Sequence, residues 1–395
     1  MAYSLAVSYA GQALIDGFDF ISTPDPTEGF VAYQNLPSAL SYGYATVNTT
    51  TNTVKLSVDS TNSYDSDGSL GGRPSIRIES KQPVDQGLVI GDFAHMPGSV
   101  CGTWPAFWMY GPDWPDGGEI DIIEGANMAY RNLISAHTGE LCTLPKSGLY
   151  TGTQQYTNCT YDEDIGLVEG CNYAPPLSDT STYGDDFNAV GGGVYAMDWT
   201  NEAIRIWHFP RNKIPQNIVD KKPDPSTWGT PQALFGGSSD PDSCDVGVSF
   251  KNMTIVLNID FCGSYAGGSQ WGSSSCYAYA SSCEIWVGNS PSHFPVQFYI
   301  RSSDERASVA QFSHRSSDKR AGVADFSHRP CDERAGVAHF SHRPYDERAG
   351  VAHFSHRPCD ERAGVAHFSH RPCNERAGVA HFSHRPYDEL GRLYR

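Results

Sequence analysis

The chain has 395 residues, a formal net charge of −17, 39 glycines, 25 prolines and 12% aromatic residues. Such a turn-rich composition favours an all-β protein, and β-sandwiches often exceed 200 residues as one domain. The first 300 residues hold 12 basic and 32 acidic side chains, a net charge of −20 that argues against a nucleic-acid partner. The sequence has no run of 18 apolar residues, so no membrane span is predicted.

The N-terminal part alternates short apolar segments with turn clusters, as in an antiparallel β protein. Residues 1–9 show neither a basic region nor a long apolar stretch, so they are not typical of a signal peptide. Residues 3–130 continue this alternation, with turns such as Asp65-Ser66-Asp67-Gly68.

Three acids within six residues form the most informative motif of the chain. The segment Glu119-Ile120-Asp121-Ile122-Ile123-Glu124 reads as a strand, since isoleucine favours strands. Glu119 and Asp121 then share one face, whereas Glu124 lies an odd step away. A β-bulge at the additional isoleucine would turn Glu124 to the same face. We therefore predict three carboxyl groups on one side of a sheet.

Carboxyl groups held this close raise one another's pKa, so one stays protonated while another ionises. An acid beside a nucleophile is what a retaining glycosidase needs. The alternative is a solvated acidic edge strand. The flanking Gly117, Gly118 and Gly125 favour a site, because glycine lets backbone approach a ligand closely. Three tryptophans precede the acids and could stack on sugar rings or pack in the core: Trp104, Trp108 and Trp114.

The segments Cys101–Trp108 and Trp114–Gly125 resemble glycoside hydrolase family 16, most closely the fungal endo-β-1,3(4)-glucanases, or laminarinases. The similarity runs from about Tyr3 to about Phe294. It includes Phe18–Phe20, Gly72–Ile78 and Asp92–Pro97. The resemblance implies a concanavalin A-like jelly roll, a β-sandwich of two curved antiparallel sheets with a glucan cleft across the concave one. Residues 1–298 would form this catalytic domain.

The resemblance also implies a retaining endo-hydrolase of β-1,3 or mixed β-1,3/1,4-glucans. Glu119 would be the nucleophile, Asp121 its assistant and Glu124 the acid/base. We expect no cofactor, no metal, a β-glucan as the partner, a monomer and an extracellular location. Two alternatives stay open: a glucan transglycosylase, and a glucan-binding protein impaired by an altered last strand.

Three further residues are candidates for binding substrate. His137 matches a histidine that the family places near the cleaved bond, although a lone histidine is often structural. Arg73 could donate to sugar hydroxyls or form a surface ion pair. Tyr265 stands where related enzymes tend to carry tryptophan, so it could replace a stacking platform.

Eight of the eleven cysteines lie before residue 300, an even number that permits four disulfides without fixing their pairing. Zinc is the competing interpretation for the Cys244–Cys283 region, but no Cys-x-x-Cys pair with histidine partners occurs there. Residues 140–192 read as long loops held by cysteines, which would wall the cleft. Residues 194–199 and 203–209 predict a hairpin, and residues 253–261 the clearest core strand.

From Arg301 onward a 14-residue unit repeats six times and ends in a partial copy. Each copy has little apolar content, so residues 299–395 are predicted to form a disordered, low-complexity tail. Metal capture by Cys331, His339 and His342, a partner-binding array, and a duplicated stretch without function are the alternatives. The repeats begin where a final strand is expected, and Pro295–Ile300 alone is short for it. An unpaired ladder would put activity in doubt.

Overall fold

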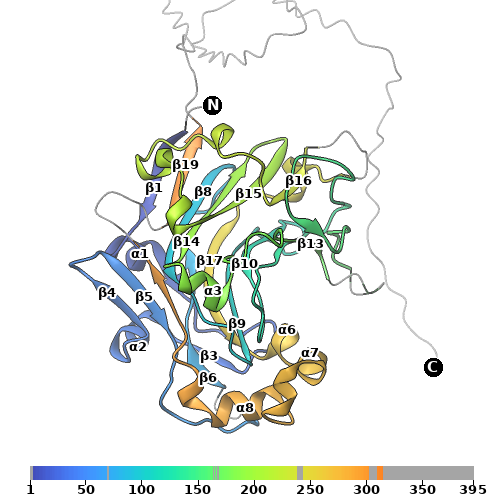
Figure 1. The fold of residues 1–395 in the computed structure, drawn as a ribbon. Helices are drawn as coiled ribbons and strands as arrows, with labels where there is room; N and C mark the ends of the chain where they lie inside the picture. Colours follow the sequence, from blue (N-terminus) through green and yellow to red (C-terminus); the bar gives the residue numbers. More distant parts are fainter. Residues whose placement is uncertain are drawn as a thin grey trace, which may run out of the picture. The chain divides into compact units, whose positions relative to one another are not determined.

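A computed structural model describes residues 3–68, 71–162, 164, 166, 169–237, 243–301 and 309–314 (Figure 1). Within these residues no helix is both long and apolar enough to span a bilayer. All pairings inside the two large sheets are antiparallel. The fold is therefore the predicted all-β sandwich.

One sheet runs in the order β16-β15-β14-β8-β18-β5-β4, with β19 joining β8 to β1. Its nine strands are β1 (Tyr3–Tyr9), β4 (Ala45–Asn48), β5 (Thr53–Ser57), β8 (Gly87–His95), β14 (Gly193–Trp199), β15 (Ala203–Pro210), β16 (Ala233–Gly236), β18 (Gln297–Ile300) and β19 (Val309–His314).

The second sheet runs in the order β12-β13-β11-β10-β9-β17-β7-β2. Its strands are β2 (Phe18–Phe20), β7 (Arg77–Ser80), β9 (Thr103–Tyr110), β10 (Glu119–Glu124), β11 (Ile134–His137), β12 (Thr153–Gln154), β13 (Cys171–Ala174) and β17 (Thr254–Phe261). A small parallel pair joins β3 (Val31–Tyr33) to β6 (Arg73–Ser75).

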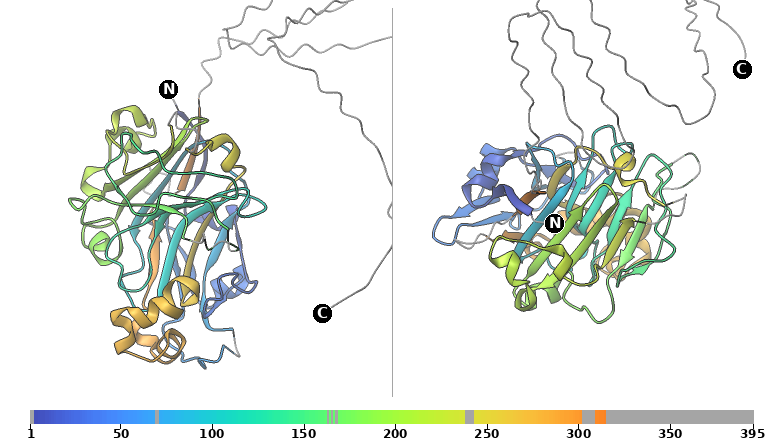
Figure 2. Two further views of the ribbon diagram at one scale, coloured as in Figure 1. Left: turned by 90° about the vertical axis from the view of Figure 1, so that its right-hand side faces the viewer. Right: turned by 90° about the horizontal axis from the view of Figure 1, so that it is seen from above.

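Short helices occupy the connections, and α6, α7 and α8 gather at one end of the sandwich (Figures 1 and 2). The α-helices are α1 (Gln12–Gly17), α2 (Leu36–Ser41), α3 (Gly184–Ala189), α4 (Gln216–Val219), α5 (Val246–Ser249), α6 (Gly263–Ala266), α7 (Gly268–Ser273) and α8 (Cys283–Asn289). The described residues also contain four 3-10 turns: η2 (Arg211–Lys213), η3 (Pro225–Thr227), η4 (Ser275–Ala278) and η5 (Pro291–His293).

The main core lies between the two sheets. The ring of Phe93 on β8 meets that of Phe107 on β9 edge to face, with centroids 5.1 Å apart. Along β9, Phe107 and Met109 are buried in this core. Because side chains alternate along a strand, the tryptophans at 104 and 108 point to the opposite, outer face. The core thus determines which face of the second sheet can meet a ligand.

The predicted hairpin and core strand are confirmed. Strands β14 and β15 pair over their whole length, from Gly193 with Pro210 to Trp199 with Ile204. Strand β17 is buried along nearly all of its residues. The segment at 140–192 is only partly loop, since β12 and β13 extend the sheet at its edge and α3 follows them.

The C-terminal strands differ from the sequence prediction. Strand β18 pairs with both β5 and β8, and its pairing with β8 stops near Phe93. Strand β19 resumes it, with Val309 opposite Gly91 and Phe312 opposite Leu88. The expected boundary after residue 298 falls inside β18, and the first repeat supplies a paired strand. The strand edge that was expected to stay unpaired is therefore paired by β18 and β19. The later repeats, from residue 315, lie outside the described residues.

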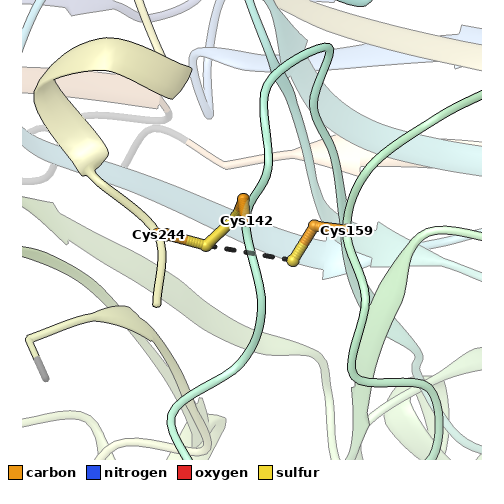
Figure 3. A group of neighbouring side chains, drawn as sticks. All are labelled: Cys142, Cys159 and Cys244. Atoms are coloured by element: carbon orange, nitrogen blue, oxygen red, sulfur yellow. Dashed lines mark hydrogen bonds between the residues drawn. A yellow bond between two sulfur atoms is a disulfide. The ribbon is translucent and has the colours of Figure 1, made fainter. Parts of the chain in front are cut away.

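Four disulfides link all eight cysteines that precede residue 300. The pairs are Cys101–Cys276, Cys142–Cys244, Cys159–Cys171 and Cys262–Cys283. The zinc interpretation of the Cys244–Cys283 region is therefore wrong. Two of the disulfides lie against each other, with the sulfur of Cys159 3.9 Å from that of Cys244 (Figure 3). Links of this kind restrict the unfolded chain and secure the loops beside β11 and β13.

Candidate active site

The predicted β-bulge is present in β10. Before it, Asp121 lies opposite Trp108 of β9; after it, Ile123 lies opposite Phe107 and Glu124 opposite Ala106. The register shift leaves Ile122 as the additional residue. Since the partners Tyr110, Trp108 and Ala106 share one face of β9, the three acids share it too. The additional isoleucine thus brings Glu119, Asp121 and Glu124 together.

A buried asparagine holds this bulge. Asn132 Nδ2 donates to the carbonyl of Ile122 at 2.8 Å, and Asn132 Oδ1 accepts from the amide of Glu124 at 2.9 Å. A bulge removes such backbone groups from the regular ladder, and leaving them unpaired in the interior would be costly. Asn132 therefore fixes the position of Glu124. The sequence analysis missed it, because a lone asparagine after a strand carries no distinctive signal.

Electrostatics of the three acids follow from burial and mutual repulsion. Burial, followed by the charge of Glu124, raises the pKa of Glu119 to about 8. Burial also raises the pKa of Glu124 to about 7. The pKa of Asp121 is raised well above its usual range by burial and then by the charges of Glu119 and Glu124. At neutral pH the group therefore retains protons while part of it is ionised.

Two indole groups donate hydrogen bonds to the glutamates and lower their pKa. Trp114 Nε1 donates to Glu119 Oε2 at 2.5 Å, and Trp104 Nε1 donates to Glu124 Oε1 at 2.9 Å. Each bond lowers the pKa of its glutamate and partly offsets burial. A hydrogen bond between the carboxyl groups of Glu119 and Asp121 favours charge on Glu119 and a proton on Asp121. The tryptophans thus orient the acids as well as border them.

His137 lies beside the acids, opposite Glu119 on β11. Its Nε2 is 4.0 Å from Asp121 Oδ2. Burial lowers the pKa of His137 to about 4, so the ring is neutral at neutral pH. Tyr161, from the loop before β13, completes this side: its ring lies 4.5 Å from that of Trp114 and 6.3 Å from that of His137.

Polar side chains that were not predicted from the sequence surround Trp108. The guanidinium carbon of Arg77 lies 5.1 Å from the centroid of the Trp108 ring. Trp108 Nε1 donates to Asn258 Oδ1 at 2.9 Å. Glu79 pairs with Arg77 at 2.8 Å and accepts from the Tyr110 hydroxyl at 3.1 Å. The alternation of residues 76–79 could have revealed this, since Ile76 and Ile78 are buried and so Arg77 and Glu79 face away from the core.

Tyr265 joins the site at the Trp104 end. Its ring meets Trp104 edge to face at 5.5 Å. Burial, and then the charges of Glu124 and Asp121, raise the pKa of Tyr265. The hydroxyl therefore remains protonated near Glu124.

The flanking glycines accommodate the protein rather than a ligand. A side chain at Gly117 would lie 2.2 Å from the carbonyl of Pro112, and one at Gly118 2.3 Å from that of Ser249. Gly118 also has φ +78°, which favours glycine. At Gly125 the obstacle is the ring of Tyr183 at 2.7 Å. These glycines let loops close tightly around β10.

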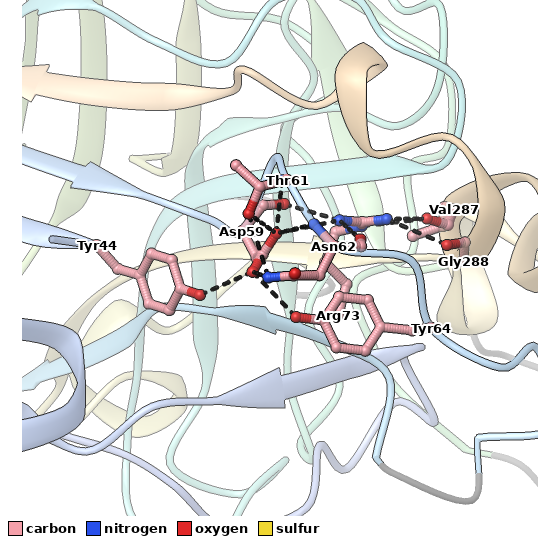
Figure 4. A network of polar contacts seen from close by, with 8 residues as sticks. All are labelled: Tyr44, Asp59, Thr61, Asn62, Tyr64, Arg73, Val287 and Gly288. Carbon is pink, nitrogen blue, oxygen red and sulfur yellow. Dashed lines mark hydrogen bonds and ion pairs between the residues drawn. The ribbon is translucent and has the colours of Figure 1, made fainter. Parts of the chain in front are cut away.

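Arg73 does not join the site, contrary to the prediction. Its side chain is fully buried and donates to the carbonyls of Asp59, Asn62 and Val287 (Figure 4). An ion pair with Asp59 at 3.8 Å is likewise buried rather than at the surface. Arg73 therefore holds the 59–62 turn against the end of α8, and its donors are occupied.

Glu119, Asp121 and His137 place one possible ligand atom each within 4.8 Å of one another. A cation there would have to displace the proton favoured on Asp121 and compete with the Trp114 hydrogen bond to Glu119. The arrangement suits acid–base chemistry better than metal binding.

Comparisons with known proteins identify the family of this chain. A family model described as an XgeA-like, catalytic GH16 domain matches residues 18–303. A probable glycosidase of Schizosaccharomyces pombe is 40% identical over 299 residues, covering 75% of this chain and 67% of that protein. The endo-1,3(4)-beta-glucanase xgeA of Emericella nidulans is 41% identical over 294 residues, covering 73% of this chain and 45% of that protein. The chain therefore spans about two thirds or less of these relatives.

Solved structures show the same fold. An elongating GH family 16 β-1,3-glucosyltransferase superposes with a TM-score of 0.71 and 39% identity, over 79% of this chain and 100% of the other. Laminarinase 16A from Phanerochaete chrysosporium gives a TM-score of 0.70 and 34% identity, over 79% and 99%. That enzyme was solved with β-glucans in its donor and acceptor sites.

Proposed function

Because the chain belongs to the XgeA-like catalytic domains of glycoside hydrolase family 16, we propose that it cleaves β-1,3 or mixed β-1,3/1,4-glucans internally with retention of configuration. The observation that carries the proposal is the bulge at Ile122, which brings Glu119, Asp121 and Glu124 to one face between tryptophans. Residues 1–314 would form the catalytic domain.

The proposed reaction has two displacements. The Glu119 carboxylate attacks the anomeric carbon while Glu124 gives its proton to the departing glycosidic oxygen, which leaves a glycosyl–enzyme ester. Glu124, now ionised, takes a proton from water, and the water oxygen attacks the same carbon and releases Glu119. Asp121 keeps its proton and donates a hydrogen bond to Glu119, so the nucleophile stays oriented.

The raised pKa of Glu124 supports its part as the acid, because an ordinary carboxyl would be ionised at neutral pH. Burial and the charge of Glu124 raise the pKa of Glu119 to about 8, above that of Glu124. The hydrogen bonds from Trp114 and Asp121 act against this rise and favour the ionised form that the nucleophile needs. Neutral His137 beside Asp121 adds no positive charge that would pull the proton from it.

The surroundings suit a neutral polysaccharide. Trp104, Trp108 and Trp114 offer ring faces and edges on the same side of the sheet as the acids, and aromatic faces pack well on sugars. The acidic body would not attract an anionic polymer. Four disulfides fit an oxidising compartment, so we propose an extracellular enzyme that acts as a monomer.

The test measures reducing ends released from laminarin and from barley β-glucan. We expect release by the full chain and by Glu202→Gln, an exposed control in the β14–β15 turn, but not by Glu119→Gln. Wild-type turnover by the Glu119 variant would overturn the assignment. Binding of laminarin without release by the full chain would favour the glucan-binding alternative.

A transglycosylase is the second candidate, supported by the solved glucosyltransferase that is 39% identical. It would share both carboxyl groups and differ in the acceptor, a sugar hydroxyl in place of water. Product lengths decide between them: oligosaccharides longer than the substrate would indicate transfer, and shorter ones alone would indicate hydrolysis.

A further inference from the structure

Strand β19 occupies a defined slot in the nine-stranded sheet. It lies between β1 and β8, antiparallel to both (Figure 1). Val309 enters the main core, whereas Ala310 and Phe312 enter a second cluster with Leu88, Ile90 and Trp207 on the other face. All three β19 side chains are at least 97% buried. In the described residues β1 pairs with β19 alone, so this slot also holds the N-terminal strand.

The sequence that fills this slot recurs in every later repeat. The segment Val309-Ala310-Gln311-Phe312-Ser313-His314 returns with the same valine, alanine, phenylalanine, serine and histidine. The five further copies are residues 323–328, 337–342, 351–356, 365–370 and 379–384. The position of Gln311 is the one that changes, to Asp325 in the second copy and to histidine in the others. Gln311 is only partly buried, so the variable position lies where β19 tolerates polarity.

We propose that the repeats are interchangeable β19 strands, so that the slot between β1 and β8 accepts a later copy when the first one fails. Each copy offers the same three apolar side chains at the same spacing and therefore the same packing as β19. The second copy is disfavoured because it would place the carboxylate of Asp325 against the sheet. The third copy, Val337–His342, carries a histidine there and is the first good replacement.

The length of the connection determines which copy is preferred. Eight residues, 301–308, separate β18 from β19 in the first copy. Using the third copy would lengthen this connection to 36 residues, 301–336, which lowers the closure probability roughly tenfold. The first copy therefore dominates in the native chain. A copy attached in cis also has an effective concentration near the millimolar range, so it outcompetes a second molecule at micromolar concentration.

Stability of full-length variants gives one test. Phe312→Asp should lower the melting temperature by only about 2–4 °C, because the third copy replaces β19. Aspartate at all six equivalent phenylalanines (312, 326, 340, 354, 368 and 382) should lower it about twice as far or prevent folding. Aspartate at the five later positions alone should leave it unchanged. A Phe312→Asp protein as unstable as the sixfold variant would contradict the proposal.

A cross-link locates the replacement strand directly. Ser8 of β1 lies opposite Ala310, so Ser8→Cys and Ala338→Cys should form a disulfide when the third copy fills the slot. In the Phe312→Asp chain, mass spectrometry of the trypsin-digested monomer should find residue 8 linked to residue 338. Adding Phe340→Asp, which spoils only the third copy, should abolish that link. Absence of the link, its survival with Phe340→Asp, or its presence only in dimers would overturn the proposal.

Discussion

Two groups of buried carboxyls in this protein have opposite protonation. Asp59 is buried, which raises its pKa, but it accepts hydrogen bonds from the backbone of Asn62 and Thr61 and from several side chains, so its pKa lies far below the usual range (Figure 4). Burial raises the pKa of Glu119, Asp121 and Glu124. Indole groups donate only to the two glutamates, and the charge of Glu124 raises the pKa of the other two acids. At Asp59 the hydrogen-bond donors outweigh burial, whereas at the three acids burial outweighs the donors.

The contrast separates structure from chemistry. Asp59 holds a turn and an arginine together and gains from being ionised. The three acids on β10 destabilise each other and retain protons that a glycosidase can use.

The two glutamates should differ when the leaving group changes. Glu119→Gln removes the proposed nucleophile, so turnover of laminarin and of a dinitrophenyl β-glucoside should both fall by roughly 10⁴-fold. Glu124→Gln should lower the turnover of laminarin to a similar extent. It should leave formation of the glycosyl–enzyme ester from the dinitrophenyl substrate unchanged, because the dinitrophenolate leaving group needs no proton. Pre-steady-state release of dinitrophenol measures this. Equal loss of that burst in both variants would contradict the division of roles.

Asp59→Asn should lower the free energy of unfolding by about 2–4 kcal/mol at pH 7, because Arg73 would lose its buried counter-charge. The folded pKa of Asp59 is depressed, so its stabilisation is present above the unfolded pKa near 4 and disappears as the pH falls through the folded value. The difference between Asp59→Asn and wild type in urea unfolding should be smaller at pH 2.5 than at pH 7, because part of the stabilisation is already lost at pH 2.5. A difference independent of pH would refute this.

Asp121→Asn should behave in the opposite sense. The folded pKa is raised, so the folded protein holds a proton that the unfolded chain loses above pH 4, and wild-type stability declines as the pH rises. Asparagine removes that decline. The variant should gain about 1–3 kcal/mol over wild type at pH 8 and nothing at pH 4. Urea unfolding across this range tests the sign, and a loss of stability at pH 8 would contradict it.

Trp114→Phe should have the smallest effect. Removing the indole donor raises the pKa of Glu119, so the acidic limb of kcat/KM should move to higher pH by about half a unit. Trp108→Phe is the matched control, since its indole donates to Asn258 rather than to an acid. The control should change KM without moving the limb. A limb that moves equally in both variants would exclude a specific role for Trp114.

Local patterns predicted much of the fold and of the acidic site. The isoleucines of β10 indicated a strand, and the odd spacing of Glu124 indicated the bulge. The hairpin β14–β15 and strand β17 followed from short-range patterns as well. These features depend on the period of two in a strand, which the sequence displays directly.

Other features depend on residues far apart in the chain. The sequence suggested that Arg73 binds sugar hydroxyls or forms a surface ion pair, yet Arg73 is buried against Val287 and Asp59 from remote segments. Asn132 is important because the β-bulge leaves the carbonyl of Ile122 and the amide of Glu124 without partners in the ladder, and its side chain bonds both. Strand β19 looked too poor in apolar residues to order, but the slot between β1 and β8 supplies the missing surface. Tertiary context overrides composition in each case.

The most direct test of the account is the configuration of the first product. Proton NMR of a laminarin oligosaccharide, recorded within the first minutes of hydrolysis, distinguishes the anomers before mutarotation mixes them. A double displacement by Glu119 and Glu124 predicts that the β-anomer accumulates first and then equilibrates. First accumulation of the α-anomer would mean a single displacement by water, and the assignment of Glu119 as the nucleophile would be wrong.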